Sequence, residues 1–244
     1  MHVLEKRRYI LGLPVDPLPL EDAINRVAGA IADRRPMQIV TLNAEMAMQA
    51  GEDPELGEVI QACGLVVPDG SGVVWALRRQ GVSTPKVPGV ELVEAMAAVG
   101  ARQGWKIYFL GAKPGVAAEA AAVLAARYPD LRIVGARDGY FKAEDEPALL
   151  AEIKEAAPDI LLVALGVPRQ EKWIAQHQKA LGVPVAMGVG GSFDVFAGHV
   201  QRAPEAFQKL HLEWLFRLMQ EPWRYKRMQS TLPRFAVEIL KRGR

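Results

Sequence analysis

One cysteine, Cys63, is present in the chain of 244 residues, so no disulfide can form within it. Long apolar runs are missing too. The longest uncharged runs, such as residues 181–193, are too short and too rich in glycine and proline to span a bilayer as a helix. No apolar segment of signal-peptide length begins the chain. These absences favour a cytosolic protein that does not cross a membrane.

Several motifs of nucleotide and metal chemistry are also absent. The chain has no GxxxxGK[ST] motif, which disfavours a P-loop NTPase, and its glycine clusters at residues 111–115 and 188–191 do not complete GxGxxG. No cysteines and histidines have zinc spacing, and no Asp-x-Asp pair is present to hold a divalent ion against a sugar nucleotide. The sequence therefore predicts neither a metal ion nor a cofactor.

The chain has 50% hydrophobic and 24% charged residues, the composition of a globular protein. This composition excludes the disordered and fibrous classes of protein. Charge is unevenly distributed along the chain. Residues 200–244 hold ten Lys or Arg and four Glu, a net charge of +6, and residues 1–199 are left with −4. Such asymmetry indicates that one end meets an anionic partner, which at this stage is a membrane, a nucleic acid or a phosphorylated substrate.

Short apolar runs alternate with alanine-rich helical patterns along most of the chain. The expected strands cover residues 38–42, 65–67, 106–110, 132–136, 160–165 and 183–189, with an earlier strand near 8–13. The expected helices cover residues 43–50, 54–62, 71–79, 90–103, 114–128, 145–156 and 168–181. Because these strands are continuously apolar, they indicate a sheet covered on both faces. The prediction is an α/β fold with a Rossmann-like, mainly parallel sheet and helices on both faces.

Two regions follow from the same pattern. Residues 1–199 form the expected α/β core, with a seam between two lobes near residues 81–89, where glycine and two prolines interrupt the pattern. Residues 200–244 form a basic, aromatic helical appendage, without which the core is expected to fold. Three of its arginines, spaced by seven and three residues, suit a diphosphate or an anionic membrane surface, although such a run often marks only a solvated face. These are Arg217, Arg224 and Arg227.

Residues that follow the strands are the first candidates for a site, because ligands bind beyond the carboxyl ends of parallel strands. Glycine turns and helix N-termini there suit a phosphate-bearing ligand. Asp69 lies between a strand and a helix start, so both a helix N-cap and a catalytic carboxylate stay open. Asn43 has the same ambiguity, and Thr41 is either a site residue or an ordinary strand residue.

The chain resembles the WecG/TagA/CpsF family of bacterial glycosyltransferases, through matching segments that occur in family order across nearly its whole length. The segments are TLNAEM (41–46), VVPDGSGVVWA (66–76), VPGVEL (87–92), FLGAKPG (109–115), DGYF (138–141), LGVPRQEKWI (165–174), MGVGGSFDVFAG (187–198) and RAPEAFQKLHLEWLFRLMQEPWRYKRM (202–228). Members of the family usually have arginine ahead of the V-x-G turn. Lys86 stands there in this chain, which keeps the charge but not the bidentate fork of a guanidinium.

The resemblance implies an inverting, metal-independent transfer of an N-acetylmannosamine-type sugar from a UDP donor to polyprenyl-diphosphate-linked N-acetylglucosamine, in cell-surface polysaccharide or teichoic acid synthesis. By motif, Asp69 would be the general base, Thr41 and Asn43 would line the catalytic pocket, and Gln170 would contact the substrate. Lys86 and the three appendage arginines would bind substrate. The remaining residues implied to hold the nucleotide are Gly111, Ala112, Lys113, Tyr140, Gly188, Gly190, Gly191 and Asp194.

The resemblance also implies a cytoplasmic protein that associates peripherally with the inner face of the cell membrane. Its expected partners are the UDP-sugar, the lipid-linked acceptor, an anionic membrane surface and a second copy of the chain in a homo-oligomer, with no nucleic acid among them. The leading alternative is a non-catalytic, nucleotide-binding Rossmann-like module that docks on a membrane or partner through its basic tail. A dehydrogenase or epimerase acting on sugar nucleotides is a further alternative, but it requires the dinucleotide fingerprint that the sequence lacks.

Overall fold

The computed structural model describes residues 6–201, 203–204, 207, 216 and 225–242, and for residues 225–230 and 242 it describes the backbone alone. Six strands form one sheet in which all neighbours are parallel. Their spatial order is β4 (Leu65–Pro68), β3 (Met37–Leu42), β8 (Val185–Gly188), β7 (Ile160–Ala164), β5 (Lys106–Gly111) and β6 (Arg132–Arg137).

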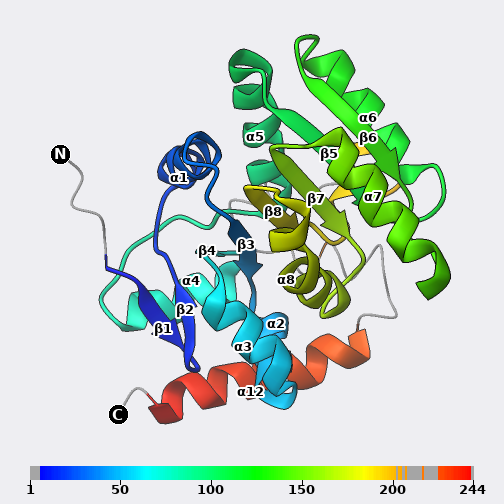
Figure 1. Ribbon diagram of the computed structural model, residues 1–244. Coiled ribbons are helices and arrows are strands. Elements are labelled where there is room, and N and C mark those ends of the chain that lie inside the picture. The colour runs from blue at the N-terminus through cyan, green and yellow to red at the C-terminus, as the bar shows by residue number, and fades with distance from the viewer. Residues whose placement is uncertain (1–5, 202, 205–206, 208–215, 217–224, 243–244) are drawn as a thin grey trace.

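Helices cover both faces of this sheet (Figure 1). One face packs against α1 (Leu20–Ala32), α5 (Gly89–Gln103), α6 (Val116–Arg127) and α9 (Ser192–Phe196). The other face packs against α2 (Ala44–Glu52), α3 (Pro54–Ala62), α4 (Ser71–Arg79), α7 (Glu146–Ala156), α8 (Arg169–Leu181) and α12 (Tyr225–Arg242), with the short 3-10 helix η1 (Ala143–Asp145) ahead of α7. The expected fold class is confirmed.

Double coverage explains why the strands are apolar without alternation. Side chains alternate between the two faces of a strand, so a strand with both faces covered needs apolar residues at every position. All five residues of β7 are buried. Ile160 and Leu162 lie in the core on the α1 and α5 side, whereas Leu161 and Val163 lie in the core on the α7 and α8 side.

The strand expected near residues 8–13 is confirmed over residues 8–10 only, because the chain then turns and returns as the second strand of a hairpin. β1 (Arg8–Ile10) pairs antiparallel with β2 (Leu13–Val15). The two-residue turn between them places Leu11 at φ +52° and Gly12 at φ +87°. Short hairpin turns need positive φ at these positions and usually show it through Asn-Gly or Asp-Gly. Leucine at the first position hides that signal, so the segment looks like one strand.

Two helices were missed in the sequence. Helix α1 begins after Pro19 without a side-chain cap, so it lacks the usual start signal. Helix α9 has only five residues, too few for a helical period to appear. The expected helix ranges elsewhere agree with the structure within two residues, and α3 and α4 agree at both ends.

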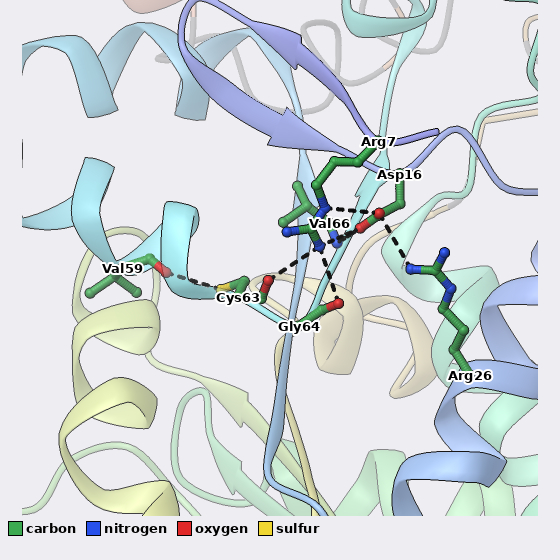
Figure 2. A network of polar contacts seen from close by, with 7 residues as sticks. All are labelled: Arg7, Asp16, Arg26, Val59, Cys63, Gly64 and Val66. Carbon is green, nitrogen blue, oxygen red and sulfur yellow. Dashed lines mark hydrogen bonds and ion pairs between the residues drawn. The ribbon is translucent and has the colours of Figure 1, made fainter. Parts of the chain in front are cut away.

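Asp16 ties the hairpin to the main sheet through a buried polar network (Figure 2). Its side chain is nearly buried and receives hydrogen bonds from Arg7 at 2.8 and 2.9 Å and from the backbone N–H of Val66 at 2.9 Å. Arg26 adds an ion pair at 3.3 Å. The carboxylate raises the pKa of Arg7, chiefly through its hydrogen bond. Two cations and a backbone donor thus compensate for burying this charge.

Residues 81–89, the expected seam, connect α4 to α5. Val87 N–H donates to Pro68 O at 2.7 Å, which holds this connection against the end of β4. β3 and β4, which precede it, lie in the same sheet as the strands that follow it. The seam and the boundary at residue 199 stay predictions.

Helix α12 lies against α2 and α4, far from both in sequence (Figure 1). Its Phe235 and Ile239 are buried in the same apolar cluster as residues of β3, α2 and α4. Arg234 also pairs with Glu52 at the end of α2, with 3.0 Å between Nη2 and Oε1. The last part of the appendage is therefore part of the core packing.

Candidate active site

The carboxyl ends of all six parallel strands lie along one edge of the sheet, and the candidate residues follow them. Asn43 follows β3 and Asp69 follows β4, so these two lie on neighbouring strands at one end. The glycine-rich turns follow β8, β7 and β5, and Tyr140 follows β6. The edge thus has a carboxylate half and a glycine-rich half.

A crevice is expected where neighbouring strands lead away from each other. β5 leads through α6 to β6 on one side, whereas its neighbour β7 leads through α8 to β8 on the other side. The turns after β5 and β7 flank this point. Ala112 N–H donates to Ala164 O at 2.8 Å, which joins the two turns directly. This is the position at which open α/β sheets bind nucleotides.

Asp69 lies between the ends of two strands. Its backbone N–H donates to Leu42 O at 2.8 Å, which holds it beside the end of β3. The N-cap position of α4 belongs to Gly70, at φ +84°. Because glycine has no side chain, this position supplies no side-chain cap to the helix. The cap position considered for Asp69 is therefore taken by its neighbour, and the Asp69 side chain is partly exposed at the sheet edge.

Thr41 and Asn43 flank Leu42, whose carbonyl oxygen accepts from the Asp69 backbone. Asn43 caps α2, since its Oδ1 accepts a hydrogen bond from Met46 N–H at 2.9 Å, so the cap interpretation is confirmed. Thr41 is buried on β3 on the opposite face of the strand from Leu42. Its Oγ1 lies 3.4 Å from where a Cβ on Gly89 would lie, so α5 begins directly against it.

Gln170 is 2% exposed and joins two loops of the glycine-rich half. Its Oε1 accepts hydrogen bonds from Gly166 N–H and Gly190 N–H, both at 3.1 Å. Its Nε2 donates to Glu171 Oε1 at 2.7 Å. These bonds connect the loops after β7 and β8, so Gln170 shapes the site from beneath.

The turn after β5 requires glycine and an unusual alanine. Gly111 and Ala112 have φ values of +121° and +61°, and a Cβ on Gly111 would lie 2.5 Å from the Ala164 backbone. Gly139 N–H donates to Ala112 O at 3.0 Å, which brings the loop after β6 onto this turn. Lys113 is exposed beyond it. The loops after β5, β6 and β7 therefore meet here through close backbone contacts.

Tyr140 is 71% exposed, and its backbone N–H donates to Asp138 Oδ1 at 2.9 Å. This Asx turn presents the ring to solvent beside the turn after β5. On the other side, Asp194 belongs to α9, and its carbonyl oxygen accepts from His199 N–H and Val200 N–H at 2.9 and 3.1 Å. The two predicted nucleotide contacts therefore follow the sheet edge, Tyr140 in the loop after β6 and Asp194 in the short helix α9 after β8.

A cavity of about 460 Å³ lies between α4 and the connection to α5. Its lining combines an indole, aliphatic groups and charged side chains: Ser71, Val74, Trp75, Arg78, Thr84, Pro85, Lys86 and Glu91. Ser71 is the first residue of α4 and follows Asp69 by two residues, so the cavity reaches the end of α4 nearest the candidate base. The structure thus places Lys86 on the carboxylate side of the edge, away from the glycine turns.

Glu171 was missed from the sequence. It is 1% exposed, and burial raises its pKa to about 7. An acidic residue in the first turn of a helix is ordinarily explained by the helix dipole, so its position gave no signal. Trp75 and Arg78, which line the cavity, were also missed because their spacing on α4 is that of an ordinary helix face.

The three arginines predicted in the appendage lie at or beyond the limit of the described side chains. Arg217 and Arg224 lie outside the described residues, and Arg227 is on α12 with its side chain outside them. What the structure does show is that α12 contacts the helices behind the site. A Cβ on Gly72 would lie 3.2 Å from Ala44 Cβ and 3.6 Å from Phe235 Cε1, at the first turns of α4 and α2.

Within the described part of the chain, no group of three or more His, Cys, Asp and Glu side chains is arranged to hold a metal ion. Among the helices that the structure describes, none combines the length and apolar character needed to cross a membrane.

Comparison with known proteins confirms the family expected from the motifs. The model of the Glycosyl transferase WecG/TagA/CpsF family matches residues 8–244. An N-acetylglucosaminyldiphosphoundecaprenol N-acetyl-beta-D-mannosaminyltransferase of Bacillus subtilis is 36% identical over 204 residues, covering 83% of this chain and 78% of the relative. The protein of the same name from Bacillus spizizenii is 36% identical over 207 residues, covering 84% and 79%. This likeness argues against the dehydrogenase and the non-catalytic binding module. The chain belongs to the WecG/TagA/CpsF family and is a glycosyltransferase.

Proposed function

We propose that the protein transfers an N-acetylmannosamine-type sugar from a UDP donor to polyprenyl-diphosphate-linked N-acetylglucosamine, with inversion and without a metal ion. The observation that supports it most is the placement of Asp69 at the carboxyl edge of the sheet, tied to the end of β3 and beside Asn43. The names of the two relatives support this acceptor and this sugar for them. The reaction would serve cell-surface polysaccharide or teichoic acid synthesis.

The chemistry requires a base on the acceptor side. Asp69 takes the proton of the acceptor hydroxyl as its oxygen attacks the anomeric carbon of the donor. The new glycosidic bond forms on the face opposite the breaking bond to UDP, so the anomeric configuration inverts. A single carboxylate is sufficient for this step, and the electron pair of the breaking bond leaves with the diphosphate.

The donor lies on the glycine-rich half of the edge. The glycine turns after β5 and β8 let the diphosphate approach the backbone closely, and Lys113 adds a cation beside the first of these turns. The exposed ring of Tyr140 suits contact with the uridine. Arg217, Arg224 and Arg227 neutralise the departing UDP in the absence of a metal ion.

The acceptor lies in the cavity beside Asp69. Its apolar lining suits the first isoprene units of a lipid, and Arg78 and Lys86 supply cations for the diphosphate next to them. Thr41 and Asn43 lie between this cavity and the donor half. In this arrangement the hydroxyl of the terminal sugar points toward Asp69, and the lipid leads away from it.

The membrane surface is the remaining partner. The outer side of α12 exposes Val237 and Leu240, each 47% exposed, beside basic residues of the same helix. Apolar side chains flanked by cations are the pattern of helices that lie on anionic lipid. We propose peripheral association with the inner face of the membrane, where the lipid-linked acceptor is found, and a homo-oligomer remains a further proposal.

The direct test uses the purified protein with UDP-N-acetylmannosamine and a short-chain lipid-diphosphate N-acetylglucosamine, with release of UDP as the readout. We expect product with the β configuration at the new bond for an α-linked donor, and turnover that persists in excess EDTA. UDP-N-acetylglucosamine is the control donor. Absence of UDP release with every donor, or activity that returns only with added magnesium or manganese, would reject the proposed reaction or its metal independence.

Asp69→Asn separates a catalytic carboxylate from a structural one. We expect turnover to fall about 100-fold or more, since general-base catalysis is lost, while UDP affinity and melting temperature stay near those of the wild type. Glu91→Gln is a matched control, because it neutralises the carboxylate that lines the cavity and leaves Asp69 in place. A lower melting temperature with full activity per folded molecule would assign Asp69 a structural role.

A further inference from the structure

Glu171 is a buried carboxylate at the junction of α8, β8 and β3. Its Oε1 accepts from Gln170 Nε2 at 2.7 Å, and its backbone carbonyl accepts from Gln38 Nε2 at 3.0 Å. Its Oε2 has no hydrogen-bond partner among the described residues. Burying a carboxylate that is incompletely bonded costs stability, and an apolar residue would avoid that cost. Compared with an apolar residue, the carboxylate at this position contributes the hydrogen bond to Gln170.

That bond determines the direction of the Gln170 amide. The amide has an acceptor oxygen at one side and a donor NH2 group at the other. Gly166 and Gly190 both donate backbone N–H groups to the oxygen at 3.1 Å. With Glu171 Oε1 accepting from the nitrogen, both ends of the Gln170 amide and both glycine N–H groups have a bond of the right polarity.

The pair is packed against β8 without spare room. A Cβ on Gly188 would lie 2.5 Å from Gln170 Nε2 and 2.7 Å from Glu171 Oε1. The glycine at the end of β8 is therefore needed for the pair to fit beneath the two loops. Burial raises the pKa of Glu171 to about 7, in accord with its enclosure.

We propose that Glu171 is a positioning residue for donor binding, which holds the Gln170 amide in the orientation that fixes the loops after β7 and β8. This inference rests on the proposed function, because those loops are where the donor diphosphate is proposed to bind. Without the carboxylate, Gln170 Nε2 loses its acceptor in a buried site, so the side chain is no longer held where its oxygen bonds Gly166 and Gly190.

Glu171→Met tests the role, since methionine has nearly the same length and no acceptor oxygen. We expect affinity for UDP, measured by calorimetry on the full chain, to fall about tenfold or more, the effect of leaving buried donors unpaired. The KM for the lipid acceptor should change less than twofold. Glu171→Gln keeps an acceptor oxygen toward Gln170 and should recover most of the lost affinity.

Gln178→Met is the matched control. Gln178 is also buried on α8, but its Nε2 donates to Val183 O and Pro184 O at 3.1 and 3.2 Å, away from the two loops. Its replacement should lower the melting temperature and leave UDP affinity unchanged. Equal loss of UDP affinity in Gln178→Met and Glu171→Met would mean general destabilisation and would overturn the proposal.

Hydrogen exchange tests the same role without any donor. Amide exchange at Gly166 and Gly190 should accelerate in Glu171→Met and not in Gln178→Met. Gln170→Met should have the same effect, and combining it with Glu171→Met should add little, because the two residues act as one unit. Unchanged exchange at both glycines would overturn the positioning role, whereas accelerated exchange in a protein that never binds UDP would reject the proposed donor site instead.

Discussion

Gly111 shows how one residue can determine the shape of a binding turn. Its φ is +121°, and a Cβ would lie 2.5 Å from the carbonyl carbon and oxygen of Ala164. In a variant with a side chain at this position, rotating a side chain would relieve neither the backbone strain nor the clash with Ala164, because the neighbouring atoms are backbone. The close approach of the turns after β5 and β7 therefore depends on glycine at this position.

Gly111→Ala should lower the free energy of unfolding by more than about 2 kcal/mol, since a strained φ and a backbone clash act together. UDP affinity of the remaining folded protein should also fall. Gly115→Ala in the same loop is the control: its φ is +88°, but its Cβ would meet only Glu119 Oε1, at 3.7 Å. It should cost about 1 kcal/mol for the backbone conformation alone. Chemical denaturation of both variants measures the difference, and equal costs would contradict the close contact.

Glu171 makes stability depend on pH at the residue scale. Its pKa in the folded protein is about 7, above the ordinary value of 4.5, because burial disfavours the charged form. Between these values the folded protein binds the proton more tightly than the unfolded chain does. This contribution to stability is therefore full below about pH 4.5, falls as pH rises, and is lost above about pH 7, by about 3 kcal/mol in total.

Glu171→Gln should flatten that part of the pH profile. Denaturant unfolding of the wild type and the variant, measured between pH 5 and about pH 8, gives the difference directly, since all other titrating groups are shared. We expect the variant to gain stability relative to the wild type as pH rises. A constant difference across the range would show that the carboxyl titrates near its ordinary pKa.

At the scale of elements, α12 is the part whose role changes most between sequence and structure. It was expected to belong to a detachable appendage, yet Phe235 is 2% exposed and lies in the apolar cluster with residues of α2 and α4. These are the helices that follow Asn43 and Asp69. Helix α12 therefore supports the elements that form the carboxylate half of the edge.

Phe235→Ala should destabilise the protein by about 3 to 5 kcal/mol, the usual cost of a cavity left by a buried phenylalanine. Val237→Ala on the exposed side of the same helix is the control and should change stability by less than about 0.5 kcal/mol. Removing residues 225–244 should then destabilise the core, contrary to the expectation from the sequence. Thermal unfolding of the variants and of the truncated chain measures these differences in stability. A truncated chain as stable as the full one would show that the core does not need α12.

At the scale of the whole molecule, charge separates the two ends of the chain, with +6 on residues 200–244 and −4 on residues 1–199. Long-range attraction to an anionic membrane would orient the basic end toward lipid and decrease with salt. The acceptor is proposed to lie in that membrane. The same positive charge is proposed to neutralise the diphosphate of the donor.

Replacing Arg224 and Arg227 by alanine separates these two uses. We expect turnover to fall even with a soluble short-chain acceptor, because the departing diphosphate loses two cationic partners. Binding to vesicles that contain anionic lipid should also weaken, whereas binding to neutral vesicles serves as the baseline. Unchanged turnover on the soluble acceptor with weaker vesicle binding would make these arginines membrane anchors only.

The sequence by itself determined the fold class, most of the helices and strands, and the residues that reach the sheet edge. Continuous apolar runs and helical periodicity depend on neighbouring residues, so they are visible in one chain. Asp69, Thr41 and Asn43 follow from the same information, because parallel strands place their carboxyl ends on one side. The ordered motifs added the family, which comparison confirmed.

Only the tertiary structure decided the strand order, and with it which loops meet. The neighbouring strands β5 and β7 lead to opposite sides of the sheet and so create the crevice between their ends. The hydrogen bonds of Gln170 join two loops whose bonded residues, Gly166 and Gly190, lie 24 residues apart in sequence. The burial of Glu171 and Phe235 was also decided there. Such contacts join segments distant in sequence and depend on which surfaces fit together, a property of long-range packing that local residue patterns do not contain.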